Sequence, residues 1–176
     1  MKNIVIVSSS MRNGNSNILC DEFEKGAKDN NNVFRIDLRN IKLNFCKACS
    51  DCYTQVFCNQ NDDMNKLYEK IKNADILVFA TPVYFGEISG QLKVFIDRLY
   101  PIYYNLKATE CYIIATCYQN NKEHINSSLN SIKRFLNNTP NHAQITKIIY
   151  GENTDECGDV TSEQRLNAYN IGKQIN

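Results

Sequence analysis

Four of the eight cysteines of this chain fall within one short segment. They are Cys46, Cys49, Cys52 and Cys58, spaced Cys-x-x-Cys-x-x-Cys-x-x-x-x-x-Cys. Four thiolates at this spacing can surround an iron–sulfur cluster, because each two-residue gap spans neighbouring irons of a cube. Zinc is a second possibility, although structural zinc sites usually divide their ligands into two separated pairs. Free thiols or a regulatory disulfide are the third interpretation, and the residues alone leave all three open.

A second group of polar side chains follows an apolar segment near the start of the chain. Residues 3–7 are rich in β-branched side chains and are predicted to form a buried parallel strand. The loop after it leads into a helix that Asn15 or Ser16 is expected to cap. Such a loop between a strand and a helix amino terminus is a common phosphate site. Besides backbone N–H groups, the candidate phosphate ligands are Ser8, Ser10, Arg12, Asn15, Ser16 and Asn17.

The glycine content of this loop limits which phosphate-containing ligands it could bind. Gly14 is its one glycine, and the loop lacks both the G-x-G-x-x-G pattern and the Gly-Lys-Ser/Thr ending of a P-loop. The loop therefore suits a single terminal phosphate, as on a mononucleotide. An ordinary capped helix after a strand is the alternative.

A third group of residues follows the next buried strand along the chain. Pro82 stiffens the turn, Val83 follows it, and Tyr84 and Phe85 offer flat apolar surface. Gly86 lets a planar ring approach the backbone closely. Backbone N–H groups there could bond the acceptor atoms of a flavin ring. The alternative is a proline that ends a strand, followed by two core aromatics.

These loops must be positioned by the strands and helices that alternate along the chain. Strands are predicted at 3–7, 33–38, 75–80, 111–116 and 145–150, and the third is expected to stop at Thr81-Pro82. Helices are predicted at 17–28, 62–73, 90–100, 123–136 and 162–175. This alternation implies an α/β fold with a parallel sheet covered on both faces. Right-handed crossovers favour the strand order 2-1-3-4-5, which places a ligand crevice where the first, third and fourth strands end.

Length and charge exclude several classes of protein. The 176 residues suit one domain, residues 1–176, with a full core. A net charge of +1 without a basic block argues against nucleic acid and anionic membranes as partners. No apolar run is long enough to span a bilayer, and the start does not resemble a secretory signal. A cytoplasmic location is therefore expected, where cysteines serve as thiols, ligands or redox groups.

With these motifs identified, the chain resembles the NADPH-dependent FMN reductase group of flavodoxin-like proteins. The resemblance implies a flavodoxin-like three-layer fold with a five-stranded parallel sheet. It places the FMN phosphate in the first loop, the isoalloxazine against the second, and a third contact after the fourth strand, at Thr116 and Cys117. The first loop is one residue shorter than the commonest form, and Met11 replaces the usual proline. The matching segments are Ser10-x-Arg12-x-Gly14-Asn15-Ser16, Pro82-Val83-Tyr84-Phe85-Gly86, Gln91-Leu92-Lys93 and Phe95-Ile96-Asp97-Arg98.

The resemblance also implies a reaction. An oxidoreductase of this group takes hydride from NAD(P)H through FMN and reduces a quinone, a nitro compound, a flavin or a protein acceptor. The cysteine spacing is similar to the compact motif of iron–sulfur flavoproteins, a branch of the family that binds a 4Fe–4S cluster beside FMN. Cluster-free relatives also carry several cysteines in this loop. A non-catalytic electron carrier between partner proteins is therefore the alternative function.

Members of the family commonly form dimers or tetramers, so a homodimer or homotetramer is expected. The aromatic segment Tyr100–Tyr104 is the predicted contact. Asp97 and Arg98 are expected to form an ion pair at a helix end or a subunit contact, without a catalytic role. The other cysteines and the histidines are expected to be structural or exposed: Cys20 and Cys111 in the core, Cys157, His124 and His142 at the surface.

Overall fold

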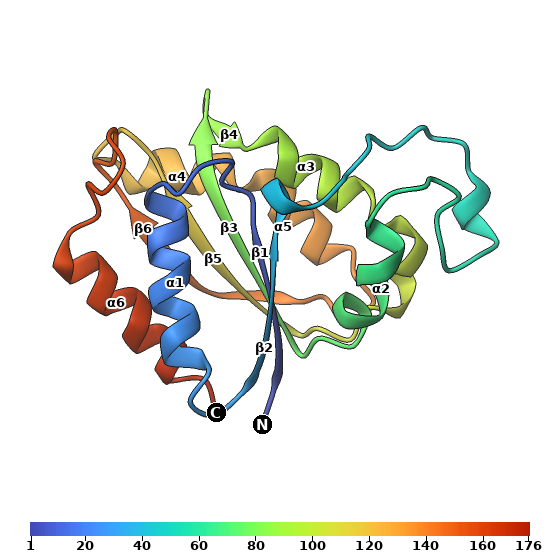
Figure 1. Cartoon of the computed structure of the whole chain (residues 1–176), viewed down its shortest axis with the longest axis horizontal. Coiled ribbons are helices and arrows are strands. Elements are labelled where there is room, and N and C mark those ends of the chain that lie inside the picture. The colour runs from blue at the N-terminus through green and yellow to red at the C-terminus, as the bar shows by residue number, and fades with distance from the viewer.

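The computed structural model describes residues 1–176 and consists of one sheet between two groups of helices (Figure 1). Five strands are parallel, in the order β2-β1-β3-β5-β6. This order confirms the predicted 2-1-3-4-5. A sixth strand, β4, pairs antiparallel with the end of β3 and was not predicted. The strands are β1 (Asn3–Ser8), β2 (Asn32–Asp37), β3 (Ile76–Tyr84), β4 (Glu87–Ile88), β5 (Glu110–Thr116) and β6 (Gln144–Gly151).

Helices cover both faces of the sheet, which gives the predicted three layers. Helices α1 and α6 lie on one face, and α2, α3 and α5 lie on the other (Figure 1). None of the helices combines the length and apolar character needed to cross a bilayer. The α-helices are α1 (Asn15–Ala27), α2 (Met64–Lys72), α3 (Gly90–Asp97), α4 (Lys122–Ser128), α5 (Asn130–Asn137) and α6 (Ser162–Lys173); short 3₁₀ turns are η1 (Leu38–Asn40), η2 (Asp51–Tyr53) and η3 (Tyr100–Asn105).

The apolar run in β1 supplies both cores, because successive side chains on a strand point to opposite faces. Ile4 and Ile6 pack in the cluster that α1 and α6 cover. Val5 and Val7 pack in the larger cluster under the helices of the opposite face. All four side chains are buried, as expected for an inner strand of a parallel sheet.

The third strand is longer than its sequence predicted. β3 continues through Thr81 and Pro82 to Tyr84, so the expected stop at the proline is wrong. Pro82 still lies opposite Thr116 of β5. Beyond it, Val83 and Tyr84 pair with β4, which extends the strand into a short hairpin.

The predicted helix 123–136 is divided into α4 and α5 at Leu129. The hydroxyl of Ser127 donates to the carbonyl of His124 at 2.9 Å, and that of Ser128 donates to the carbonyl of Ile125 at 2.7 Å. Such bonds compete with regular helix hydrogen bonding, which explains a break that apolar spacing alone did not predict.

Helix α1 begins two residues earlier than predicted and is capped differently. Gly14 is the N-cap residue and makes no side-chain cap bond. The expectation that Asn15 or Ser16 caps the helix is therefore wrong. The Asn15 side chain bonds to the loop after β6 and the Ser16 side chain to the end of β5 instead, as described below.

Replacing Gly26 by alanine is expected to destabilise the fold, because α1 and α6 touch there. A Cβ atom at Gly26 would lie 2.1 Å from the carbonyl oxygen of Tyr169. The helices would have to separate, so the free energy of unfolding should fall by about 1–3 kcal/mol. Gly90→Ala is the control, because its Cβ would meet nothing within 4 Å. Urea unfolding measures both, and equal midpoints for Gly26→Ala and wild type would contradict this packing.

Candidate functional site

Three loops meet at the carboxyl edge of the sheet. β1, β3 and β5 are neighbours, with Ser8 opposite Ala80 and Pro82 opposite Thr116. The loops that follow these strands therefore lie along one edge, at the top of Figure 1. This is the position predicted for the ligand crevice. The loops are named here the first loop (residues 9–14), the second loop (residues 85–86, with flanking β3 and β4) and the third loop (residues 117–121).

Two buried pairs of hydroxyl groups connect the three loops. Ser89, after β4, donates from Oγ to Ser9 Oγ at 2.8 Å. Ser9 in turn donates to the carbonyl of Ala80 at 3.0 Å. Ser16 Oγ and Thr116 Oγ1 are 2.6 Å apart, which connects the start of α1 to the end of β5. These bonds hold the first loop against the residues that flank the second loop, and the start of α1 against the strand that leads into the third.

The first loop offers a row of free hydrogen-bond donors. None of the backbone N–H groups from Ser10 to Ser16 donates to another protein atom. Ser10 Oγ donates to the carbonyl of Arg12 at 2.8 Å, and the Arg12 side chain is exposed and makes no ion pair. Free N–H groups at a helix amino terminus beside a cation can bind an anion.

Other predicted phosphate ligands support this loop. Ser8 Oγ donates to Asn17 Oδ1 at 2.8 Å. Asn15 donates to the carbonyl of Glu156 at 2.7 Å and accepts from the N–H of Gly158 at 2.9 Å. Asn15 therefore ties the loop after β6 to the start of α1. No local pattern of residues could indicate this contact, because its partners are about 140 residues apart.

Arg35 of β2 is a further supporting residue that the sequence reasoning missed. Its guanidinium donates to Asn17 Oδ1 at 2.8 Å and pairs with Asp21, Glu24 and Asp37. The bonds to Asn17, Asp21 and Glu24 fix successive turns of α1 against β2. Only the strand pairing brings Arg35 to this place, so no motif could have identified it.

The second loop presents an exposed aromatic turn. Phe85 and Gly86 both have positive φ, +50° and +79°, a conformation that costs a non-glycine residue energy. Phe85 is fully exposed, and Tyr84 is half exposed. His124 of α4 lies behind the turn, with Cε1 3.8 Å from where a Gly86 Cβ would be. His124 is half-buried, so it is more covered than the surface position predicted for it.

The third loop holds Cys117 in a packing role. Its thiol donates to the carbonyl of Gln119 at 3.0 Å, and its carbonyl accepts from Thr154 Oγ1 at 3.1 Å. Burial raises the pKa of the Cys117 thiol, so the neutral form dominates near pH 7.

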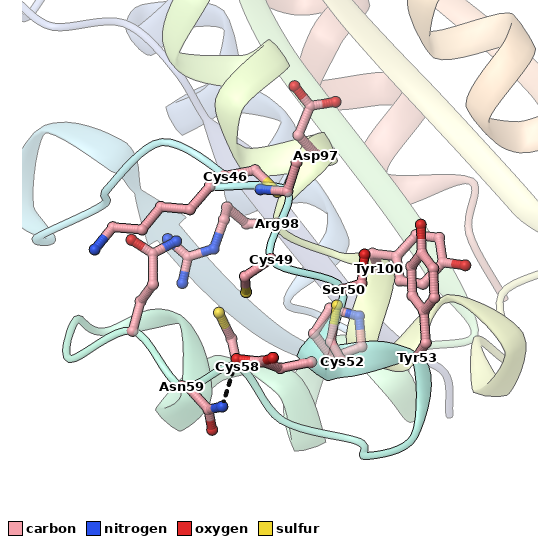
Figure 2. A pocket seen from close by; sticks show the side chains of 15 residues that line it. Cys46, Cys49, Ser50, Cys52, Tyr53, Cys58, Asn59, Asp97, Arg98 and Tyr100 are labelled. Atoms are coloured by element: carbon pink, nitrogen blue, oxygen red, sulfur yellow. Dashed lines mark hydrogen bonds between the residues drawn. The ribbon is translucent and has the colours of Figure 1, made fainter.

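The four clustered cysteines line one cavity of about 320 Å³, whose wall is completed by the end of α3 and the start of η3 (Figure 2). Figure 2 shows the sulfur atoms of Cys49 and Cys58 pointing toward one another. Partial burial raises the pKa of Cys52, and the charges of Cys58, Cys46 and Cys49 add to the rise. All eight cysteines are free thiols, and no three His, Cys, Asp or Glu side chains already stand as a metal-ligand set. The structure therefore brings the four thiols to one cavity without closing them around an ion.

Burial divides the cysteines into two classes of expected reactivity. Burial raises the pKa of Cys20 to about 12 and raises that of Cys111 as well, so neither forms thiolate near neutral pH. Iodoacetamide is expected to label exposed Cys46, Cys49 and Cys157 first. Peptide mass spectrometry measures this, with urea-unfolded protein as the control in which every cysteine reacts. Native labelling of Cys20 as fast as Cys157 would contradict the burial.

Comparison with known proteins finds relatives whose names mention both an iron–sulfur group and a flavin. The chain is 31% identical over 102 residues to an iron-sulfur flavoprotein of Archaeoglobus fulgidus, covering 57% of this chain and 46% of that one. It is 35% identical over 103 residues to an iron-sulfur flavoprotein of Methanocaldococcus jannaschii, covering 58% and 53%. The matches thus span about half the length of these curated relatives.

Solved structures and a family profile agree with the fold. An NAD(P)H:quinone oxidoreductase from Methanothermobacter marburgensis superposes with a TM-score of 0.72 over 98% of this chain and 96% of that chain. Its sequence identity is 12%, so the likeness concerns the fold. The profile of the family described as NADPH-dependent FMN reductase matches residues 1–139, which include all three loops and the four clustered cysteines. The chain therefore belongs to the NADPH-dependent FMN reductase family.

Proposed function

We propose that this protein is an FMN-dependent oxidoreductase that takes hydride from NAD(P)H and reduces a small-molecule or protein acceptor. Quinones, nitro compounds and free flavins are the proposed small acceptors. The observation that carries the proposal is the row of free N–H groups from Ser10 to Ser16, beside the exposed turn Tyr84–Gly86. Family membership over residues 1–139 supports the same cofactor.

The residues of the first loop fit a phosphate. Arg12 supplies an exposed positive charge, and the N–H groups of the loop and of the first turn of α1 supply donors. The proposed phosphate ligands are these N–H groups with Ser10, Arg12 and Ser16. Ser8, Asn15 and Asn17 are proposed to hold the loop in place, through the Ser8–Asn17 bond and the bonds of Asn15 to Glu156 and Gly158.

The second and third loops fit a flat ring. Gly86 has no side chain to block close approach, and the N–H groups of Phe85 and Gly86 donate to no protein atom. Pro82, Val83, Thr116 and Cys117 form the adjoining strand ends that would border the ring. Bound FMN would supply the redox chemistry, accepting hydride at N5 and releasing electrons to the acceptor. The protein's part is to anchor the phosphate, orient the ring and limit access of water.

Removing the Arg12 side chain is expected to weaken FMN binding about tenfold, because a charge-assisted bond to the phosphate is lost. Arg134→Ala is the matched control, since Arg134 is an exposed arginine on α5. Fluorescence titration with FMN measures both variants. If a double variant, Arg12→Ala with Ser16→Ala, bound FMN with wild-type affinity, the phosphate would have to lie elsewhere.

A second candidate function is electron carriage by an iron–sulfur flavoprotein. The observation that favours it is the common cavity of Cys46, Cys49, Cys52 and Cys58. Gln60 Oε1, in the lining of the same cavity, is buried without a hydrogen-bond partner. The names of the curated relatives support a cluster, which would supply single-electron transfer. Steady-state NAD(P)H oxidation with a small acceptor distinguishes the enzyme from the carrier.

Anaerobic reconstitution with iron and sulfide is expected to give about four irons per chain and absorbance near ~400 nm beyond the flavin bands. Cys49→Ala should abolish that iron and leave FMN bound, because the flavin loops follow other strands. Cys157→Ala is the control, since Cys157 is an exposed cysteine outside the cavity. Reconstituted wild type that holds no iron would exclude the cluster.

Association into a homodimer or homotetramer is also part of the proposal. In the predicted contact segment, Tyr100 and Tyr104 are exposed, whereas Pro101 and Ile102 are buried in the chain's own core. The two tyrosine rings lie edge-to-face, 6.3 Å apart. They are the part of the segment that a second subunit could cover.

A further inference from the structure

A buried ion pair lies at the base of the loop that carries the four cysteines, named here the cysteine loop (residues 45–61). Arg98, at the end of α3, contacts Asp62 through two bonds, of 2.5 Å and 3.0 Å. The Arg98 and Asp62 side chains are 2% and 0% exposed. Asp97, by contrast, pairs with Lys93 on the surface of α3. The sequence suggested a local ion pair for Arg98, but its partner is 36 residues away.

Further hydrogen bonds connect this pair to Asn44, the residue that precedes the loop, and to Met64, which follows it. Arg98 Nη1 donates to the carbonyl of Asn44 at 2.6 Å. The N–H of Asn44 donates to Asp62 Oδ2 at 3.0 Å. Asp62 itself directly follows the loop, and its Oδ1 accepts from the N–H of Met64 at 3.2 Å. The two ends of the cysteine loop are therefore joined at one buried point.

The loop depends on such polar contacts because it contains no strand and no α-helix. Within it, Gln60 donates to the carbonyl of Phe45 at 2.9 Å, and Asn59 donates to Asp51 at 2.8 Å. Both bonds are solvent-exposed. The Arg98–Asp62 pair is buried and is also connected to α2, through the bond from Tyr68 Oη to the Arg98 carbonyl.

We propose that Arg98 and Asp62 are positioning residues that close the cysteine loop and so gather its four thiols for one metal cluster. This inference rests on the proposed four-cysteine site and adds the residues that pre-organise it. Joining the ends of a flexible loop removes much of its conformational freedom. Asp62 neutralises Arg98, so the pair brings no net charge to the thiols, and its role is geometric.

Two variants test the pair without leaving a buried charge unpaired. Arg98→Met combined with Asp62→Leu removes both charges and keeps similar volume, a change that buried ion pairs often tolerate. Arg98→Lys keeps the charge, but one ammonium group cannot reproduce the planar fork that holds both Asp62 and Asn44. The control is Glu22→Ala with Lys25→Ala, which removes an exposed ion pair on α1.

The first measurement is hydrogen–deuterium exchange of metal-free protein, which does not depend on any cluster. In the double variant, amides of residues 45–61 are expected to exchange about tenfold faster or more. The amides of Asn44 and Met64 should also exchange faster because they lose Asp62 as acceptor, with the rest of the chain unchanged. The second measurement is iron content after anaerobic reconstitution with iron and sulfide. The double variant should keep less than about a tenth of the wild-type iron while binding FMN normally.

Wild-type exchange in the loop together with wild-type iron content would overturn the proposal. If the double variant fails to fold, exchange and iron content are compared between Arg98→Lys and wild type instead. Arg98→Lys is expected to lose part of the amide protection in residues 45–61 and part of the bound iron, and wild-type values of both would overturn the proposal. If wild type itself takes up no iron, the metal site is refuted, and the exchange data alone decide whether the pair closes the loop.

Discussion

The shared carboxyl edge of β1, β3 and β5 is the constraint on which the candidate flavin site depends. Parallel pairing makes these three strands end together, so three loops distant in sequence become neighbours. The hydroxyl pairs Ser9–Ser89 and Ser16–Thr116 then fix the loops relative to one another. Since these bonds are buried, they keep most of their strength, and the free N–H groups of the first loop remain available.

The two candidate redox sites are held in different ways. The flavin loops follow strands of a sheet whose two faces are packed with apolar side chains. In the cysteine loop, Cys58 packs against the larger core and Tyr53 against Tyr100, and a buried ion pair with hydrogen bonds joins the ends of the loop. A sheet edge suits a large rigid cofactor, whereas a loop of polar contacts can adjust around a compact cluster. The family relation is common to both sites.

The fold could be predicted from the sequence because the apolar strand segments, the helical spacing of apolar residues and their alternation along the chain all indicated the same architecture. The apolar run of β1 and the alternating strands and helices were enough to give the sheet order. Misplaced boundaries had local causes that apolar spacing does not record. Serine hydroxyls divide α4 from α5, and β4 extends β3 beyond Pro82.

The site was predictable only in part. Ser10, Arg12 and the turn at Gly86 stand in motifs, so their types and spacing identified them. Asn15 and Arg98 also stand in motifs, but their partners are set by tertiary structure and could not be read from the chain. Arg35 and the position of His124 beside Gly86 have no local signature at all.

Comparing FMN with riboflavin tests the central claim most directly, because the two ligands differ only in the phosphate. Isothermal titration of the wild-type protein with each ligand gives both affinities. The free N–H groups of the first loop and Arg12 predict that FMN binds at least about a hundredfold more tightly, from several bonds to a charged group. Equal affinities for FMN and riboflavin, or no binding of either, would contradict the assignment of this sheet edge as a flavin mononucleotide site.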